Sequence, residues 1–473
     1  MSESHTGTGV HGQVVVIGGG ISGLAAAYEL ARAGARVTLL EASARLGGKL
    51  HADEIAGVPV DLGAESMLAR RPEAVALARE VGLGDDLEPP AAQNAALWTR
   101  GRLRPMPKGS VMGVPGDLGP LAASGVLSAP GLARLPLDHV LPRTEVGDDV
   151  AVGAYVAARL GREVVDRLVE PLLGGVYAGN AYQISLRAAV PQLYAAVADG
   201  RARSLIEAAR GIQQRAAANA STAPVFNGIR GGVGRLPLAV AEAARAAGAV
   251  IETGAAVREL SRTPGGWRVV VDGRVIKADG VVLAVPAAAA ARLLAAEAPA
   301  AAAELDGVDY ASMALVTMAF RRNDLLQLPH SSGFLVPPVD GRTIKAATFS
   351  SRKWGWLDAS GGDTVVLRTS VGRFGEEADL AWDDTDLVRL SREDLAEAVG
   401  LRAAPIAARV TRWDAGLPQY PVGHVARVTR IREAVAKLPA LSACGALYDG
   451  VGIPACIASA RRAATEVLTP ARP

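Results

Sequence analysis

The sequence predicts an α/β fold with α+β insertions, in which one domain built on a parallel sheet is interrupted twice. Three observations predict it. An apolar run, Val14 to Ile17, is followed at once by a glycine-rich turn, 18–23, and a helical pattern, Leu24 to Ala33. Strand-like runs return between residues 250 and 285, and a strand with a second glycine-rich turn follows at 444–453. Apolar strands that alternate with helices are typical of a parallel sheet covered on both faces.

The first strand, turn and helix have the pattern of a dinucleotide site. Glycines directly after a buried strand let the backbone approach a pyrophosphate at the positive start of a helix. A second apolar strand, Val37 to Leu40, ends at Glu41, eighteen positions after Gly23, where a carboxylate that binds ribose belongs. Because strand, turn, helix and acid agree, we expect a Rossmann-like domain that binds a dinucleotide.

Composition and charge exclude several classes of protein. The chain has 473 residues, enough for two or three domains, and a formal net charge of only +2, which argues against nucleic-acid binding. Cys444 and Cys456 match neither a zinc pattern nor a disulfide framework, and residues 1–12 lack the features of a signal peptide. We find no metal-ligating cluster and no Ser-His-Asp set. A reducing cytoplasm fits best.

No segment has the pattern of a transmembrane helix. Arg292, Glu297 and Glu304 interrupt the alanine-rich stretch 287–304, which we expect to be an amphipathic surface helix. The Pro- and Gly-rich stretch 100–142 contains scattered leucines that leave peripheral membrane contact open, at the inner face of the membrane. Short helices that cover a pocket are the preferred interpretation of that stretch.

The remaining patterns divide the chain into five ranges. The cofactor domain is expected in three parts, 13–81, 220–305 and 408–473. A helical insertion for substrate access or membrane contact is expected at 82–219, and an antiparallel substrate-binding sheet at 306–407. The helical patterns are 150–160, 162–169 and 203–218, and the alternating strands are 314–321, 343–350 and 364–373. Four strands, 250–252, 267–271, 275–277 and 281–285, are expected to finish the sheet of the cofactor domain.

The residues after Glu41 indicate which dinucleotide is bound. Arg45, Gly47, Gly48 and Lys49 form an Arg-x-Gly-Gly-Lys motif, which resembles the extension found in FAD enzymes of the amine oxidase superfamily. The glycines let a loop pass beside the diphosphate, while the cations offer charge to it. The amine oxidases usually end this motif in arginine, so Lys49 departs from them.

Motifs in the middle and at the end of the chain make the resemblance specific. The run Glu170-Pro171-Leu172 with Gly174 to Gly179 is similar to the protoporphyrinogen/coproporphyrinogen oxidase family rather than to the amine oxidases. So are Trp413 with 417–424, and Gly445 to Gly452 with 456–459. Together with 227–236, the resemblance covers nearly the whole chain from Val14 to Val467. A helix that starts after the last glycine turn would place partial positive charge near a reduced flavin.

The resemblance implies a set of cofactor and substrate residues. Glu65 is a weak candidate for proton transfer, with a structural carboxylate as the alternative. Gly175 and Tyr177 are expected at the substrate cavity by family position alone, and His424 is expected to be structural. The expected FAD contacts are Gly18, Gly19, Gly20, Ile21, Ser22, Gly23, Glu41, Ala42, Arg45, Lys49, Gly63, Ala64, Glu65, Ser66, Val257 beside the adenine, and Trp413, Val451, Gly452 and Ile453 beside the flavin ring.

The resemblance also implies an activity. A porphyrinogen loses six hydrogens in three two-electron steps, for which a flavin reoxidised by molecular oxygen suffices, with hydrogen peroxide as product. We expect FAD-dependent oxidation of coproporphyrinogen III to coproporphyrin III in heme biosynthesis, with transient contacts to neighbouring enzymes of that pathway. Protoporphyrinogen IX oxidation, an amine oxidase and a non-enzymatic FAD-binding protein are the alternatives. Candidate partners of the propionates, most of them interpreted as solvated, are Arg100, Arg102, Arg104, Lys108, Lys345, Arg352 and Lys353.

Overall fold

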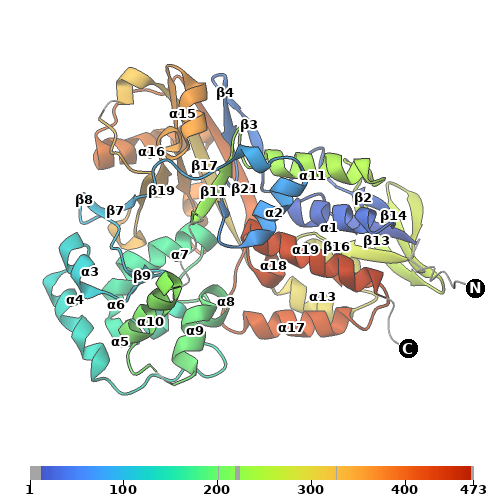
Figure 1. Cartoon of the computed structure of the whole chain (residues 1–473), viewed down its shortest axis with the longest axis horizontal. Coiled ribbons are helices and arrows are strands. Elements are labelled where there is room, and N and C mark those ends of the chain that lie inside the picture. The colour runs from blue at the N-terminus through green and yellow to red at the C-terminus, as the bar shows by residue number, and fades with distance from the viewer. Residues whose placement is uncertain (1–11, 201, 219–223, 326, 470–473) are drawn as a thin grey trace, which may run out of the picture.

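The centre of the cofactor domain is a five-stranded parallel sheet (Figure 1). The computed structural model describes residues 12–200, 202–218, 224–325 and 327–469. Residues 1–11, for which the sequence predicts no signal peptide, lie outside the described residues. The strand order is β12 (Val250–Glu252), β2 (Arg36–Leu40), β1 (Gln13–Ile17), β16 (Gly280–Leu283) and β22 (Leu441–Ala443). Strands from the start, the middle and the end of the sequence therefore meet in one sheet.

Helices and a small sheet cover the two faces of this parallel sheet. Alternate residues of β1 point to opposite sides: Val14 and Val16 belong to one buried cluster, Val15 and Ile17 to the other. Strands buried on both faces are typical of parallel sheets. The first face carries α1 (Ile21–Arg32), α2 (Pro72–Glu80), α11 (Arg235–Ala246) and α19 (Ile453–Leu468). The second face carries β13 (Val257–Thr263), β14 (Gly266–Val271), β15 (Arg274–Ala278), α12 (Ala287–Leu294), α13 (Pro299–Asp306) and α17 (His424–Val435).

Two expectations about this region are wrong. The strands expected at 267–271 and 275–277 do not extend the parallel sheet; with β13 they form a separate antiparallel sheet on its second face. Their alternating burial, with Trp267, Val269 and Val271 buried, shows one face packed and the other solvated. The single helix expected at 287–304 is two helices, α12 and α13, because Pro299 starts a new helix at a position where a helix interior could not accept it.

The second large unit is a seven-stranded sheet that confirms the three alternating strands predicted from the sequence. Its order is β21 (Ala407–Pro418), β17 (Tyr310–Arg321), β20 (Thr364–Val371), β19 (Ile344–Thr348), β18 (Gly333–Leu335), β7 (Ala95–Thr99) and β8 (Arg102–Pro105). All pairs are antiparallel except β18 with β7. The sheet thus contains β7 and β8, which precede the 306–407 range, and β21, which extends beyond it. Its helices are α14 (Ser350–Lys353), α15 (Gly355–Gly361) and α16 (Asp384–Val399).

The third unit is helical, as predicted, and occupies the lower left of Figure 1. A π-helical turn, Val165–Val169, lies between α6 and α7. The helices are α3 (Leu118–Ser124), α4 (Ala129–Arg134), α5 (Val152–Leu160), α6 (Arg162–Val164), α7 (Glu170–Tyr177), α8 (Leu186–Ala189), α9 (Pro191–Ala198) and α10 (Leu205–Ala218). The short elements that connect the units are β3 (Ala52–Ile55), β4 (Val58–Asp61), β5 (Met67–Leu68), β6 (Leu87–Glu88), β9 (Ser110–Val111), β10 (Val114–Pro115), β11 (Phe226–Ile229), α18 (Ala446–Asp449) and the 3-10 turns Gly84–Asp86, Leu135–His139, Arg322–Leu325, Pro338–Asp340 and Glu377–Ala381.

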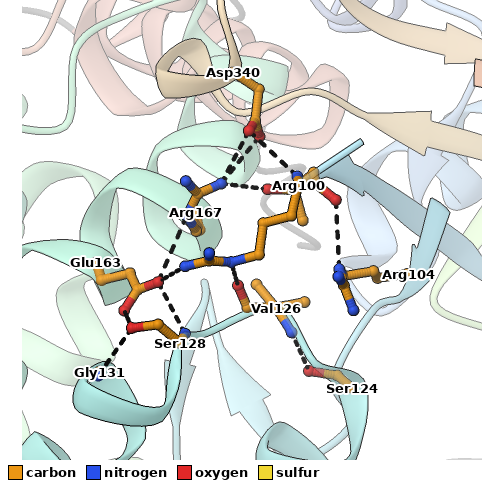
Figure 2. A network of polar contacts seen from close by, with 10 residues as sticks. Arg100, Arg104, Ser124, Val126, Ser128, Gly131, Glu163, Arg167 and Asp340 are labelled. Atoms are coloured by element: carbon orange, nitrogen blue, oxygen red, sulfur yellow. Dashed lines mark hydrogen bonds and ion pairs between the residues drawn. The ribbon is translucent and has the colours of Figure 1, made fainter. Parts of the chain in front are cut away.

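A polar network joins the helical unit to the seven-stranded sheet (Figure 2). Arg100, in the turn between β7 and β8, donates to Glu163 of the helical unit and to the carbonyl of Val126. Arg167, on the π-helical turn, donates to Asp340 at 3.0 Å and lies 3.7 Å from Glu163. Arg100, a candidate partner of a substrate propionate, is therefore paired with Glu163 within the protein.

Candidate cofactor and substrate site

The glycine-rich turn after β1 is shaped by close backbone contacts on one side and open space on the other. Gly18 has a φ of +109°, and a Cβ there would lie 2.4 Å from the carbonyl oxygen of Ala284. A Cβ on Gly23 would lie 1.8 Å from the carbonyl oxygen of Gly18. At Gly20 nothing lies within 4 Å of the same position. Larger residues cannot replace Gly18 or Gly23, and the open side at Gly20 leaves room for a ligand.

The turn delivers a helix start that has no side-chain cap. Gly20 is the N-cap of α1, no side chain accepts from the first turn, and no acidic residue lies there. The first residues of α1, Ile21, Ser22 and Gly23, are buried. The first amides of a helix need acceptors from outside the helix, and a diphosphate supplies them together with negative charge. The residues present therefore fit the diphosphate of a dinucleotide.

Glu41 lies beside this turn at the end of β2. Its Oε2 accepts from the backbone N–H of Gly19 at 2.6 Å, and its Oε1 accepts from the backbone N–H and the hydroxyl of Ser43 at 2.8 and 2.7 Å. The carbonyl of Glu41 accepts from Ala255, which leads into β13 and the buried Val257. Val257, expected at the adenine, is thus placed next to the Glu41 loop.

The Arg45–Lys49 loop contacts the glycine turn directly. Gly47 donates to the carbonyl of Gly19, and Gly47 and Gly20 form a parallel bridge. Arg45 donates to the carbonyls of Leu46 and Gly48 at 3.0 and 2.7 Å, so its guanidinium braces its own loop. Lys49 is accessible, but the protein atoms around it desolvate its ammonium and lower its pKa.

The start of α19 lies beside the start of α1. The N-cap residue of α19 is Gly452, and no side chain makes a capping hydrogen bond there. A Cβ on Gly445 would lie 4.0 Å from Oγ of Ser22, and the charge of Lys49 acts on the buried Cys456. Figure 1 shows the two helices packed together although one lies near each end of the sequence. Val451, Gly452 and Ile453 therefore lie at a second uncapped helix start, close to the first.

The 63–66 segment closes the same region. The backbone N–H of Ala64 donates to the carbonyl of Lys49, and a Cβ on Gly63 would lie 2.0 Å from that carbonyl oxygen. The indole N–H of Trp413 donates to the carbonyl of Leu62 at 3.0 Å, and its ring would lie 3.2 Å from the same Cβ of Gly63. Trp413 is held by its indole beside the glycine segment and is half-buried.

Glu65 belongs to a buried ion-pair cluster. Its Oε1 accepts from Nζ of Lys353 at 2.5 Å, and its Oε2 lies 3.2 Å from the guanidinium of Arg368. Burial alone would raise the pKa of the Glu65 carboxyl, but the charges of Arg368 and Lys353 outweigh burial and hold that pKa below its ordinary value. A carboxylate kept ionised and doubly paired is a poor proton carrier. The geometry favours the structural alternative for Glu65.

Tyr177 and His424 meet in an aromatic array near the glycine turn of α19. The rings of Tyr177 and Tyr420 are 5.4 Å apart, and Tyr420 stacks on His424 at 4.0 Å. Tyr420 donates to the carbonyl of Ala446, and Nε2 of His424 lies 3.0 Å from the carbonyl of Leu447. Burial lowers the pKa of His424 to about 4, which supports the expected structural role.

Sequence reasoning missed three charged residues that the fold places in two clusters. Arg368 pairs with Glu65, while the buried Arg373 is next to Lys345 and is also acted on by the buried Glu170. Glu170 and Arg373 were present in segments singled out for other reasons, Glu170 in the motif before Gly174 and Arg373 at the end of a predicted strand. A charged residue at the end of a buried strand was the available signal. Lys345, interpreted as one of several surface cations, is buried.

The chain matches a family model across almost its whole length. The model is that of the flavin containing amine oxidoreductases, and it matches residues 21–468. The chain belongs to this family. Its members are flavoenzymes, which confirms the predicted oxidoreductase class and the FAD cofactor that the two uncapped helix starts fit. Among the described residues no helix is long and apolar enough to span a membrane.

Curated relatives of the chain carry porphyrinogen oxidase names. The chain is 39% identical over 462 residues to the coproporphyrinogen III oxidase of Mycobacterium tuberculosis, covering 96% of each chain. It is 32% identical over 467 residues to the coproporphyrinogen III oxidase of Bacillus subtilis, covering 96% of this chain and 98% of the relative. The protoporphyrinogen oxidase of Bos taurus is 32% identical over 480 residues, with 96% and 98% covered.

Two solved structures agree with the fold. A crystal structure of a candidate protoporphyrinogen oxidase from Exiguobacterium sp. 255-15 superposes with a TM-score of 0.85 at 33% identity, covering 96% of this chain and 98% of that one. Cyclohexylamine oxidase from Brevibacterium oxydans IH-35A superposes with a TM-score of 0.69 at 16% identity, covering 97% and 99%. The second match shows a shared fold alone.

Proposed function

We propose that this protein oxidises coproporphyrinogen III to coproporphyrin III with FAD and molecular oxygen, releasing hydrogen peroxide, as a step of heme biosynthesis. The observation that carries the proposal is the full-length similarity, at 39% identity, to a relative named coproporphyrinogen III oxidase. The uncapped starts of α1 and α19 support it, because they fit the diphosphate and the ring of FAD.

The proposed reaction removes six hydrogens from the porphyrinogen and passes them to three oxygen molecules, giving three molecules of hydrogen peroxide. FAD, when bound, supplies the two-electron redox chemistry. The protein has to hold the cofactor, orient the substrate and exclude water. Glu41 would bind the ribose, the start of α1 the diphosphate, and the start of α19 the ring, while Trp413 and Gly63 would form a wall beside it.

The array of Tyr177, Tyr420 and His424 is proposed to support the substrate side of the site. Burial raises the pKa of Tyr177 to about 12, and the pKa of His424 lies near 4, so both stay neutral at physiological pH. Neutral aromatic side chains give a macrocycle an apolar surface without adding charge. A Cβ on Gly175 would lie 3.6 Å from Leu335, an ordinary contact distance, so α7 lies against β18 at this position.

Protoporphyrinogen IX oxidation is the second candidate, favoured by the similarity to the Bos taurus protein of that name. A direct comparison decides between them. Purified holoenzyme is mixed with coproporphyrinogen III, protoporphyrinogen IX or a polyamine, while porphyrin fluorescence and peroxide are followed. We expect the fastest turnover with coproporphyrinogen III. Porphyrin formation no faster than autoxidation, together with amine turnover, would overturn the proposal. Equal rates with both porphyrinogens would contradict the proposed preference for coproporphyrinogen III.

The place of action is part of the same proposal. We place the enzyme in the cytoplasm, with contact to the inner face of the membrane and transient contact with neighbouring enzymes of the heme pathway as further proposals. Fractionation of cells that express the protein would test the first point. Recovery of the protein mainly in an extracellular fraction would contradict it.

A further inference from the structure

Two buried basic side chains lie side by side in the seven-stranded sheet. Lys345, on β19, is 6% exposed, and Arg373, just after β20, is 8% exposed. Nζ of Lys345 donates to the carbonyl of Gly372 at 2.6 Å, and Nη2 of Arg373 donates to the carbonyl of Val336 at 3.0 Å. Each cation therefore has a backbone carbonyl as its hydrogen-bond partner, and these bonds leave donors of both groups unused.

The carboxylates around this pair, Glu376, Glu170 and Asp379, act on Arg373, whereas the charge that acts on Lys345 is that of Arg373 itself. Glu376 lies 4.0 Å from Arg373, but its side chain is 62% exposed. Glu170 is buried and acts on Arg373, yet its Oε2 already accepts from the backbone N–H of Ala181 at 2.6 Å. Burial raises the pKa of Glu170 to about 7, so this carboxyl is only partly ionised near neutrality. Burial and the charge of Arg373 lower the pKa of Lys345 to about 7, so the lysine is only partly charged near neutrality, and a ligand carboxylate beside it would favour its charged form.

Arg373 lies next to the end of α7, which contacts the residues that precede α19. The backbone N–H of Phe374 donates to the carbonyl of Ala178, at the end of α7. The preceding residue, Tyr177, contacts Tyr420, and Tyr420 donates to the carbonyl of Ala446 just before the glycine turn of α19. A continuous set of contacts thus connects Arg373 with the region where the flavin ring is proposed to lie.

We propose that Lys345 and Arg373 together form a recognition site for a carboxylate side chain of the substrate. The inference rests on the proposed function and names the part of the substrate that this protein selects. An arginine fork and an ammonium group can share the two oxygens of one carboxylate, because the fork matches its planar geometry and the ammonium adds a point charge. The same two charges repel a cationic amine.

The first test measures binding, without turnover. Fluorescence titration of the holoenzyme with coproporphyrin III, which carries four carboxylates, is compared with titration by its tetramethyl ester in the same detergent. We expect the wild type to bind the acid at least tenfold more tightly than the ester. Equal affinities in the wild type would overturn the inference without any variant.

The second test uses substitutions. Lys345→Met and Arg373→Met should each weaken binding of coproporphyrin III at least tenfold and leave ester binding within twofold, while Lys345→Arg should restore most of the acid affinity. Lys437→Met removes an exposed lysine and is the matched control. Flavin content and Tm establish that each variant is folded. Folded Met variants that bind the acid as the wild type does would overturn the inference.

Turnover separates this inference from the proposed function. With coproporphyrinogen III, Lys345→Met should raise KM at least tenfold and change kcat less than threefold, whereas KM for the tetramethyl ester should not change. A wild type that oxidises coproporphyrinogen III while Lys345→Met has an unaltered KM contradicts the carboxylate site alone. A wild type that oxidises no porphyrinogen contradicts the proposed function.

Discussion

The carboxylate of Glu41 accepts a hydrogen bond from the backbone N–H of Gly19 at 2.6 Å, across 22 positions of sequence. This contact joins the end of β2 to the glycine turn after β1. It also places the carboxylate beside the open position at Gly20, where a ligand can approach. One residue therefore holds the turn in place and is available to the ribose hydroxyls of a dinucleotide.

Glu41→Ala should weaken FAD binding by roughly 10- to 100-fold, because a hydrogen bond to a charged group contributes about 1.5–3 kcal/mol. The measurement is flavin fluorescence during titration of the apoprotein with FAD. Glu54→Ala removes an exposed carboxylate on β3 and is the control. Equal FAD affinity in the two variants would exclude Glu41 from the cofactor site.

Lys49→Glu should lower the retention of FAD on gel filtration, since it places a negative charge beside the carbonyl that contacts Ala64 and near the start of α19. Lys437→Glu makes the same change of charge at an exposed position and should retain FAD like the wild type. Unchanged retention in Lys49→Glu would contradict the role assigned to this lysine.

Lys353→Met should destabilise the protein by about 1–3 kcal/mol, because it leaves Oε1 of the buried Glu65 without its hydrogen-bond donor. The double variant Lys353→Met, Glu65→Gln should recover part of that loss, as removal of both charges avoids an unpaired buried ion. Urea unfolding measures both.

If Glu65 is structural, Glu65→Gln alone retains kcat within threefold at saturating substrate. A much larger loss of kcat in a folded, FAD-bound protein would restore Glu65 as a proton-transfer group.

Asp340→Ala should loosen the junction between the helical unit and the seven-stranded sheet. Asp340 accepts from Arg167 on the π-helical turn and from the backbone N–H of Arg100 in the β7–β8 turn (Figure 2). Hydrogen exchange should speed up in β7, β8 and α6 and remain unchanged in α1. Asp324→Ala, at an exposed position on the same unit, is the control. Unaltered exchange at the junction would show that the network does not hold the two units together.

Glu170 should make the free energy of unfolding depend on pH between about 4.5 and 7. Burial raises its folded pKa from the ordinary value of 4.5 to about 7, although the Ala181 amide and Arg373 oppose this; Glu376 and Asp166 add to it. In that window the folded state binds more protons than the unfolded state, so the contribution of Glu170 to stability falls as pH rises.

The variant Glu170→Gln isolates this contribution. The difference in unfolding free energy, wild type minus Glu170→Gln, should decrease from pH 4.5 to pH 7 and level off above it. Glu433→Gln, at an exposed position, should show no such trend. A difference that rises with pH over this range would mean that Glu170 is stabilised as a carboxylate, with a folded pKa below its ordinary value.

Much of the cofactor side could be predicted because its signals are local. The strand, the turn at Gly18 to Gly23 and the helix start are consecutive in sequence, and their geometry follows from close backbone contacts that only glycine permits. Glu41 follows the next strand at a spacing that the βαβ unit imposes. The domain ranges remain a prediction, although β7, β8 and β21 join one sheet with strands from 306–407.

The strands between 257 and 278 could not be placed from sequence. Their alternating pattern is compatible with the edge of a parallel sheet or with a separate antiparallel one, and the choice depends on which surface they cover. Trp267 decides it by packing against the second face, where its indole N–H donates to the carbonyl of Pro439 at 2.9 Å. A contact across 172 positions leaves no signal in a local pattern.

The sequence by itself determined that a dinucleotide is held at Gly18 to Gly23 and Glu41, because consecutive residues create that cradle. Only the tertiary structure decided that α1 and α19 start side by side, that Glu65 is paired with Lys353 and Arg368, and that Lys345 and Arg373 are buried together. The physical reason is that the burial and the partners of a charge are set by segments far apart in the chain. An isolated lysine or glutamate in a sequence looks solvated until the fold supplies its neighbours.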